Sequence, residues 1–114
     1  MKVYRVSVAM VRGIQQHVMP SIRRGGDREI ADQLHRASRS VALNVAEALG
    51  LLPGKRQRNH FQIALGSARE TMACIELAVA TGLLDEREAN ARLVADRVDH
   101  VCAMLWKLTR RNAA

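Results

Sequence analysis

The sequence predicts an all-α protein, an antiparallel up-down-up-down four-helix bundle that forms one domain over residues 1–114. Apolar residues recur at three- and four-residue steps in four segments, which is the period of amphipathic helices. Glycine or proline marks each of the three short intervals between these segments. The chain has only two prolines and is rich in alanine, leucine, valine and arginine, a composition that favours helices over a sheet. Short connections make consecutive helices antiparallel neighbours.

The first two helices are separated by a glycine pair. The first is predicted over about residues 3–19 and is expected to end or kink near Pro20, which lacks a backbone donor. The second should begin after Asp27, whose carboxylate suits an N-cap, and close at Gly50. The apolar stripe of the first is Val3, Val6, Met10, Ile14 and Val18. The stripe of the second is Ile30, Leu34, Ala37, Val41, Asn44 and Ala48.

The last two helices have equally regular stripes. The third is predicted to begin at or soon after residues 53–55 and to end at Gly82. Asp85 and Glu88 resemble a capping box for the fourth, which should fray over residues 110–114. The two stripes are Phe61, Leu65, Ala68, Met72, Ile75 and Val79, and then Val94, Val98, Val101, Leu105 and Leu108.

The first helix carries more apolar residues than one stripe needs. The additional ones are Tyr4, Val8, Val11, Met19 and Ile22. A second apolar face on a small bundle is typical of a subunit contact. A wide stripe that faces the core explains the same pattern, so both interpretations stay open.

Polar residues interrupt the apolar stripes of the second and third helices. Asn44 lies on its stripe with Glu47 beside it, and Ser67 and Glu70 fall at about the same level of the antiparallel partner. We expect Asn44 and Glu47 to be substantially buried and hydrogen-bonded where the second and third helices pack, with Ser67 or Glu70 among the partners, because a satisfied polar layer fixes helix register. Small residues in both stripes should let the helices approach closely. These are Ala37, Ala48, Ala64, Gly66 and Ala68.

No pattern in the sequence indicates an enzyme, a metal site or a cofactor. Glu47 and Glu70 would be the acid/base pair of a catalytic interpretation, which no other residue supports. The histidines do not form the paired Glu-x-x-His set of a di-metal bundle. Cys74 and Cys102 are lone thiols without metal spacing and are expected to be reduced, as in a cytosolic protein.

The charge of the chain is strongly positive and uneven. Eighteen Lys and Arg residues against eleven Asp and Glu residues give a net charge of +7. In the predicted topology the N-terminus, the turn between the second and third helices and the C-terminus meet at one end. That end would gather Lys2, Arg5, Lys55, Arg56, Arg58, Lys107, Arg110 and Arg111. Such a cluster is typical of a phosphate-contacting surface, and no aromatic residue is expected among these cations, so base stacking is not predicted.

The N-terminal segment and the hydropathy bear on location. The apolar run at residues 1–13 is broken by Arg5 and Arg12 and has neither a signal-peptide core nor a cleavage site. No run approaches the ~20 apolar residues of a membrane span. We therefore expect a soluble, cytoplasmic protein without a membrane partner.

Two segments carry a resemblance to a known family. The resemblance lies in the segments DQLHRASRSVALNVAE, at residues 32–47, and IALGSARE, at residues 63–70. In these segments the chain resembles the bacterial proteins encoded by intervening sequences of 23S ribosomal RNA genes. They are also similar to the accessory variability proteins of diversity-generating retroelements, which share the fold. The family usually continues with Gly-x-Gly-Arg where this chain has Ala48, Leu49, Gly50 and Leu51, so the first glycine and the arginine are missing. The resemblance implies a four-helix bundle that often forms a ring-like pentamer and, in the retroelement relatives, binds nucleic acid and a reverse transcriptase.

Two hypotheses for function follow. In the first, the chain is a basic, non-enzymatic accessory factor that self-associates, as a pentamer first and a dimer second, and binds nucleic acid through phosphate contacts. In the second, it is a protein–protein module that docks a partner on the apolar face of the first helix, and its charge serves solubility. Salt separates them, because phosphate binding weakens steeply as salt rises and apolar docking does not.

Overall fold

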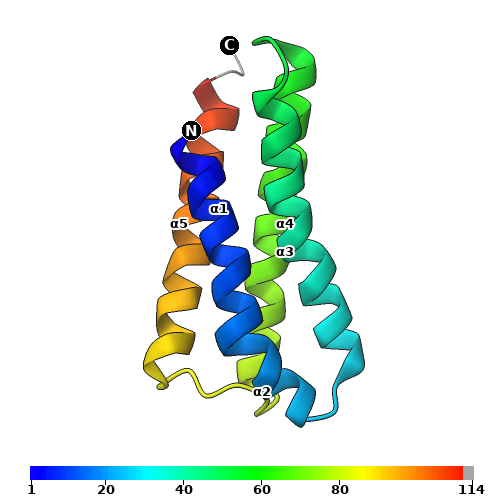
Figure 1. The fold of residues 1–114 in the computed structure, drawn as a ribbon, viewed down its shortest axis with the longest axis vertical. Coiled ribbons are helices and arrows are strands. Elements are labelled where there is room, and N and C mark those ends of the chain that lie inside the picture. Colours follow the sequence, from blue (N-terminus) through cyan, green and yellow to red (C-terminus); the bar gives the residue numbers. More distant parts are fainter. Residues whose placement is uncertain (112–114) are drawn as a thin grey trace.

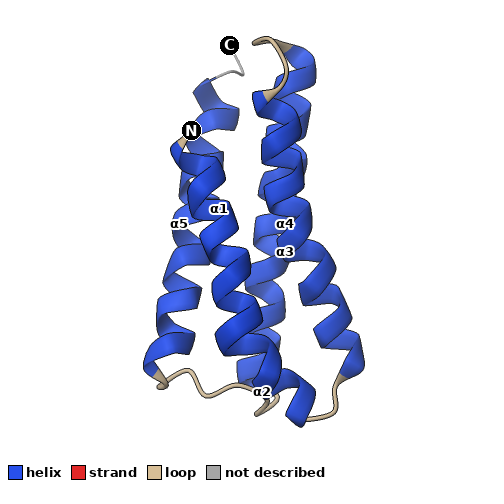
Figure 2. Ribbon diagram, in the orientation of Figure 1, coloured by secondary structure: helices blue, strands red, loops and turns tan. Residues whose placement is uncertain are grey.

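In the computed structural model the helices of the described residues pack as antiparallel rods (Figures 1 and 2). The structure describes residues 1–111, with side chains for residues 1–110, and these residues contain no strand. The elements are α1 (Lys2–Gly13), the π-helix η1 (Ile14–Val18), α2 (Met19–Arg24), α3 (Arg28–Leu49), α4 (Lys55–Ala80) and α5 (Ala89–Arg111). The 26 residues of α4 make a rod of about 39 Å. Since the molecule measures 43 × 24 × 20 Å, this helix spans most of its length, and the predicted bundle is confirmed.

The first rod is longer than predicted, because the chain remains helical past Pro20 as far as Arg24. Pro20 cannot donate a backbone hydrogen bond, and its ring would clash with the carbonyl one turn earlier. The π-turn at Ile14–Val18 widens the helix just before the proline, and the Met19 N–H bonds to the Ile14 carbonyl five residues back. Pro20 then occupies the start of α2, a position that tolerates it. The helix therefore accommodates Pro20 through a π-bulge and does not end there.

The start of α3 follows the prediction. The Asp27 carboxylate accepts a hydrogen bond from the Ile30 N–H at 3.0 Å and so caps the helix. Its inward face differs by one residue from the predicted stripe near the C-terminal end. Val41, Val45 and Ala48 are fully buried, whereas Asn44 is only half-buried.

The connection between α4 and α5 is the least well predicted. Gly82, at φ +78°, ends α4, and the Leu83 N–H donates to the Ala78 carbonyl at 2.8 Å, as in a Schellman motif. The predicted capping box of Asp85 and Glu88 is wrong. The Glu88 carboxylate itself precedes the helix and accepts from the Asn90 and Ala91 N–H groups at 3.1 and 2.9 Å.

The core is aliphatic, and α3 packs most extensively on α4. Phe61 is the one aromatic side chain among the buried residues that the structure describes. The four alanines predicted at the contact of these two helices are buried, and their small side chains allow the two backbones to approach closely. They are Ala37, Ala48, Ala64 and Ala68. Four buried hydroxyls, of Ser7, Ser38, Thr71 and Thr109, each donate to a backbone carbonyl three or four residues earlier. None of the described helices combines the length and the hydropathy that crossing a bilayer requires.

Candidate nucleic-acid interface

The topology brings three cationic segments to one end of the bundle. The start of α1, the turn between α3 and α4 and the last turns of α5 all lie at the top of the view in Figure 1. We call this region the basic end. Its described side chains are Lys2, Arg5, Lys55, Arg56, Arg58, Lys107 and Arg110. Arg111 was predicted to join them, and its side chain lies outside the described part of the chain.

The cations of the basic end have no carboxylate partner. Six of the seven are exposed, and Arg58 is half-buried. Among the side chains of residues 1–110, the one ion pair within 4.0 Å joins Arg87 to Asp85 at 3.1 Å, at the opposite end of the bundle. That contact lowers the pKa of Asp85 through hydrogen bonds from Arg87. Glu47, near the C-terminus of α3, and Glu70, next to Arg69 on α4, are exposed acids on this half of the bundle, and neither lies within 4.0 Å of these cations.

An aromatic residue lies next to these cations, contrary to the prediction. Trp106 is 47% exposed on α5. The guanidinium carbon of Arg110 lies 5.2 Å from the centroid of its ring, and that of Arg69, on α4, lies 5.8 Å away. The sequence shows that Trp106 is adjacent to Lys107. The contact of its ring with Arg69 depends on how α5 packs on α4, which the sequence does not show.

The predicted polar layer exists, but its members differ from those expected. Asn44 Nδ2 donates to the Ser40 carbonyl at 2.9 Å and lies 3.2 Å from Ser40 Oγ. Its Oδ1 is 3.1 Å from His60 Nδ1, so the His60 nitrogen is the donor in this pair. Ser40 Oγ in turn lies 2.8 Å from Ser67 Oγ on α4. A chain of four half-buried side chains thus links α3 to α4.

The two carboxylates assigned to this layer lie outside it. The side chains of Glu47 and Glu70 are both exposed, and their carboxylates form no ion pair within the described residues, so the expectation that Glu47 is buried is wrong. Gly66 is likewise exposed, and a Cβ built there would meet no atom within 4 Å. It therefore does not serve the close packing of α3 on α4.

The second apolar face of the first helix is smaller than predicted. Met19 and Ile22 are fully buried in the core, which supports the wide-stripe interpretation for these two. Val8 and Val11 instead line a shallow groove of about 520 Å³ with Leu43 of α3, which is 66% exposed. Arg12, Gln15, Gln16, Arg39 and Ala42 complete the lining. We call this the α1–α3 groove.

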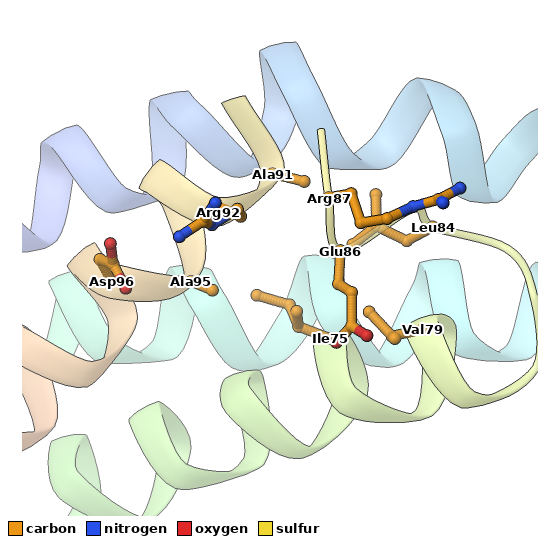
Figure 3. A pocket seen from close by; sticks show the side chains of 9 residues that line it. All are labelled: Ile75, Val79, Leu84, Glu86, Arg87, Ala91, Arg92, Ala95 and Asp96. Atoms are coloured by element: carbon orange, nitrogen blue, oxygen red, sulfur yellow. The ribbon is translucent and has the colours of Figure 1, made fainter. Parts of the chain in front are cut away.

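A second depression lies at the opposite end of the bundle, where α4, α5 and the loop between them meet (Figure 3). Its volume is about 460 Å³, and Ile75, Val79 and Leu84 belong to its apolar part. Its charged lining consists of Glu86, Arg87, Arg92 and Asp96. Two acids and two cations leave no net charge to select a polyanion, so this pocket is not the candidate site.

The remaining reactive groups of the described residues include two free thiols, those of Cys74 and Cys102. Burial raises the pKa of both thiols, and nearby acids act in the same direction, Glu70 on Cys74 and Asp99 on Cys102. A thiol with a raised pKa is a weak nucleophile at neutral pH. Within the described residues, no three His, Cys, Asp or Glu side chains gather as metal ligands would.

The fold and the comparisons agree on the class of protein. Four long antiparallel helices with an aliphatic core define a four-helix-bundle protein. The chain belongs to the 23S rRNA-intervening sequence protein family, whose model matches residues 1–107. A crystal structure of a protein of unknown function from the S23 ribosomal protein family of Bacteroides thetaiotaomicron is similar to it, with a TM-score of 0.81. The two chains are 19% identical over 94% of this chain and 97% of that one, which supports the fold alone. No curated protein matches the sequence.

Proposed function

We propose that this chain is a non-enzymatic, self-associating accessory factor that binds nucleic acid through phosphate contacts at the basic end. The observation that carries the proposal is the meeting of seven cations from three separate segments, none of which has a carboxylate within 4.0 Å among the described side chains. Unpaired surface cations keep their full charge for a ligand. A protein that contacts several phosphates gains affinity mainly by releasing counterions from the nucleic acid.

The composition of the basic end suits phosphate. Arg5, Arg56, Arg58 and Arg110 offer planar guanidinium groups that form two parallel hydrogen bonds with phosphate oxygens. Lys55 and Arg56 also stand in the first turn of α4, where the helix dipole adds positive potential and no acidic residue offsets it. The family name refers to intervening sequences of 23S rRNA, which makes RNA the first ligand to test.

Self-association is the second part of the proposal. The α1–α3 groove presents Val8, Val11 and Leu43 to solvent, and burying them against another copy would remove apolar surface from water. A ring-like pentamer is the first expectation, from the family resemblance, and a dimer is the second. Either assembly would repeat the basic end in every subunit, so several patches would engage one polyanion and raise its avidity. A reverse transcriptase partner and a cytoplasmic location belong to the same proposal.

The alternative is a module that docks an unrelated protein on the α1–α3 groove, with the charge serving only solubility. The groove itself favours this possibility, since Val8, Val11 and Leu43 give it a largely apolar lining that is open to solvent. Under this alternative, substitutions in the groove would weaken binding of the partner protein, and substitutions at the basic end would not.

A charge-reversal variant tests the proposal. Lys55, Arg56 and Arg58 changed together to glutamate should weaken binding of a labelled RNA by at least about 10-fold, because three phosphate contacts become repulsive. The fold should survive, since two of the new acids would lie in the first turn of α4, where the helix dipole favours them.

A charge-matched control is available at the other end of the bundle. Arg23, Arg24 and Arg28 are exposed around the turn between α2 and α3, and their reversal changes the net charge equally. This control should bind nearly as well as the unaltered chain. Equal losses in both variants would show that net charge alone matters and would reject the basic end as the site.

A further inference from the structure

Trp106 differs from the other exposed apolar side chains of the bundle because of its neighbours. It is the only tryptophan of the chain and follows Leu105, which is fully buried, so its indole falls outside the core stripe of α5. Arg110 approaches the ring from one helical turn further along α5, and Arg69 approaches from α4. Guanidinium groups from two helices therefore hold a half-exposed indole at the margin of the basic end.

A nucleobase can replace one of the two arginines on the Trp106 ring. A cation–π contact at an exposed site is weaker than the stacking of a nucleobase on an aromatic ring. A base that stacked on the indole would displace one guanidinium, which could then form two hydrogen bonds with a phosphate next to that base. Lys107, the next residue along α5, is exposed and adds a third positive charge on the same turn of the helix.

We propose that Trp106 is a stacking platform for an unpaired base of a single-stranded nucleic acid, with Arg69, Arg110 and Lys107 contacting the flanking phosphates. This inference rests on the proposed function and specifies its ligand. Bases within a duplex are already stacked on each other and cannot reach the ring, whereas those of a single strand present a free π-face. Single strands should therefore bind better than duplexes of the same length.

Tryptophan fluorescence provides a direct test, because Trp106 is the one tryptophan of the chain and excitation at the red edge of the indole band leaves Tyr4 dark. Short oligoadenylate and oligouridylate should quench the emission on binding. A duplex of equal length and inorganic polyphosphate, which has the charge but no bases, should bind in a salt-dependent way without comparable quenching. The two polyanion controls separate stacking from phosphate contact.

Variants give a second readout through a labelled oligoadenylate. Trp106→Ala should weaken its binding about 5- to 100-fold, the range expected for the loss of one stacked base. Trp106→Phe keeps an aromatic face and should retain most of the affinity. Leu93→Ala is a matched control, since Leu93 is 50% exposed near the other end of α5, and should have no effect. None of these variants should alter the binding of polyphosphate.

Three results would overturn the inference. The first is salt-dependent binding of oligoadenylate that leaves the emission unchanged. The second is an equal loss of oligoadenylate and polyphosphate affinity in Trp106→Ala, which would reduce the ring to a support for the arginines. The third is an emission that changes with protein concentration, together with dissociation of Trp106→Ala, because a second copy would then cover the ring. In the first case the proposed function survives, whereas failure of polyphosphate to bind would count against the proposed function itself.

Discussion

Asn44 shows how a polar side chain on a helix seam is accommodated in this fold. Its amide donates twice to Ser40, and its carbonyl oxygen accepts from His60, so three of the four hydrogen-bonding positions of the side chain are used. Because the residue is half-buried, water reaches part of this cluster and reduces the cost of losing one member.

We therefore expect Asn44→Ala to lower the free energy of unfolding by about 1–2 kcal/mol, since it leaves the His60 Nδ1–H without its acceptor. The Ser40 hydroxyl loses one partner and keeps its contact with Ser67. Chemical denaturation followed by circular dichroism measures the change. Glu47→Ala is the control, because Glu47 is exposed and its removal should stay within about 0.5 kcal/mol. An unchanged midpoint for Asn44→Ala would mean that the cluster does not contribute to stability.

The composition of the polar layer could be predicted only in part. The stripe spacing identified Asn44 and Ser67 as members. The spacing did not show whether residue 44 or residue 45 points inward, since both lie within the width of a helix face. His60 was not predicted, because its position depends on where α4 begins relative to the end of α3. Glu47 and Glu70 were assigned to the layer by helical adjacency and are in fact solvated.

At the scale of the helices, Gly66 lies in the middle of α4, where no close contact within the chain requires a glycine. A Cβ at this position meets nothing within 4 Å, and glycine weakens a helix interior by its conformational freedom. Gly66→Ala should therefore raise the free energy of unfolding by about 0.5–1 kcal/mol.

The measurement is denaturation at a protein concentration where the chain is monomeric. A destabilised monomer would contradict the packing described for α4. A stabilised monomer that self-associates less well would instead show that another copy approaches Gly66, which would add this face of α4 to the assembly surface.

The α1–α3 groove leads to a separate prediction. Leu43→Asp should weaken self-association at least about 10-fold, because a charge would be buried in the contact, while the monomer keeps its stability within about 0.5 kcal/mol. Light scattering at micromolar concentration would follow the loss of a species near five times, or twice, the 12.7 kDa of one chain. Leu93→Asp, an equally drastic change on α5, should leave the assembly intact. An unaltered chain that scatters as a monomer would reject the groove as a subunit contact.

Local sequence signals predicted most of the elements, with errors where two signals compete. The Asp27 cap and the Gly82 terminus follow from side-chain chemistry and backbone freedom. Pro20 is a strong helix breaker, but the π-turn before it inserts one extra residue into the helix, so the missing N–H and the proline ring no longer interrupt it. Such compensation depends on packing against the other helices, which the local sequence does not encode. The Asp85–Glu88 pair had the spacing of a capping box, and the helix began three residues later than that box requires.

For the whole molecule, the order of the helices decides where the charge lies. Three cationic segments that are about 50 residues apart along the chain meet because each connection between helices is short and the rods are antiparallel. This consequence could be predicted from the sequence once four helices were recognised. The contact of Arg69 with Trp106 could not, because it depends on the level at which α5 packs on α4, and that level follows from the longer loop before Ala89.

The dependence of RNA affinity on salt tests the phosphate-binding claim most directly. The logarithm of the association constant should fall linearly with the logarithm of salt concentration, with a slope of about −0.7 for each phosphate neutralised on a single strand. The Lys55, Arg56 and Arg58 reversal should make this slope shallower by about 2, and the reversal of Arg23, Arg24 and Arg28 should leave it unchanged. Binding that ignores salt, or slopes that change equally in both variants, would contradict the account.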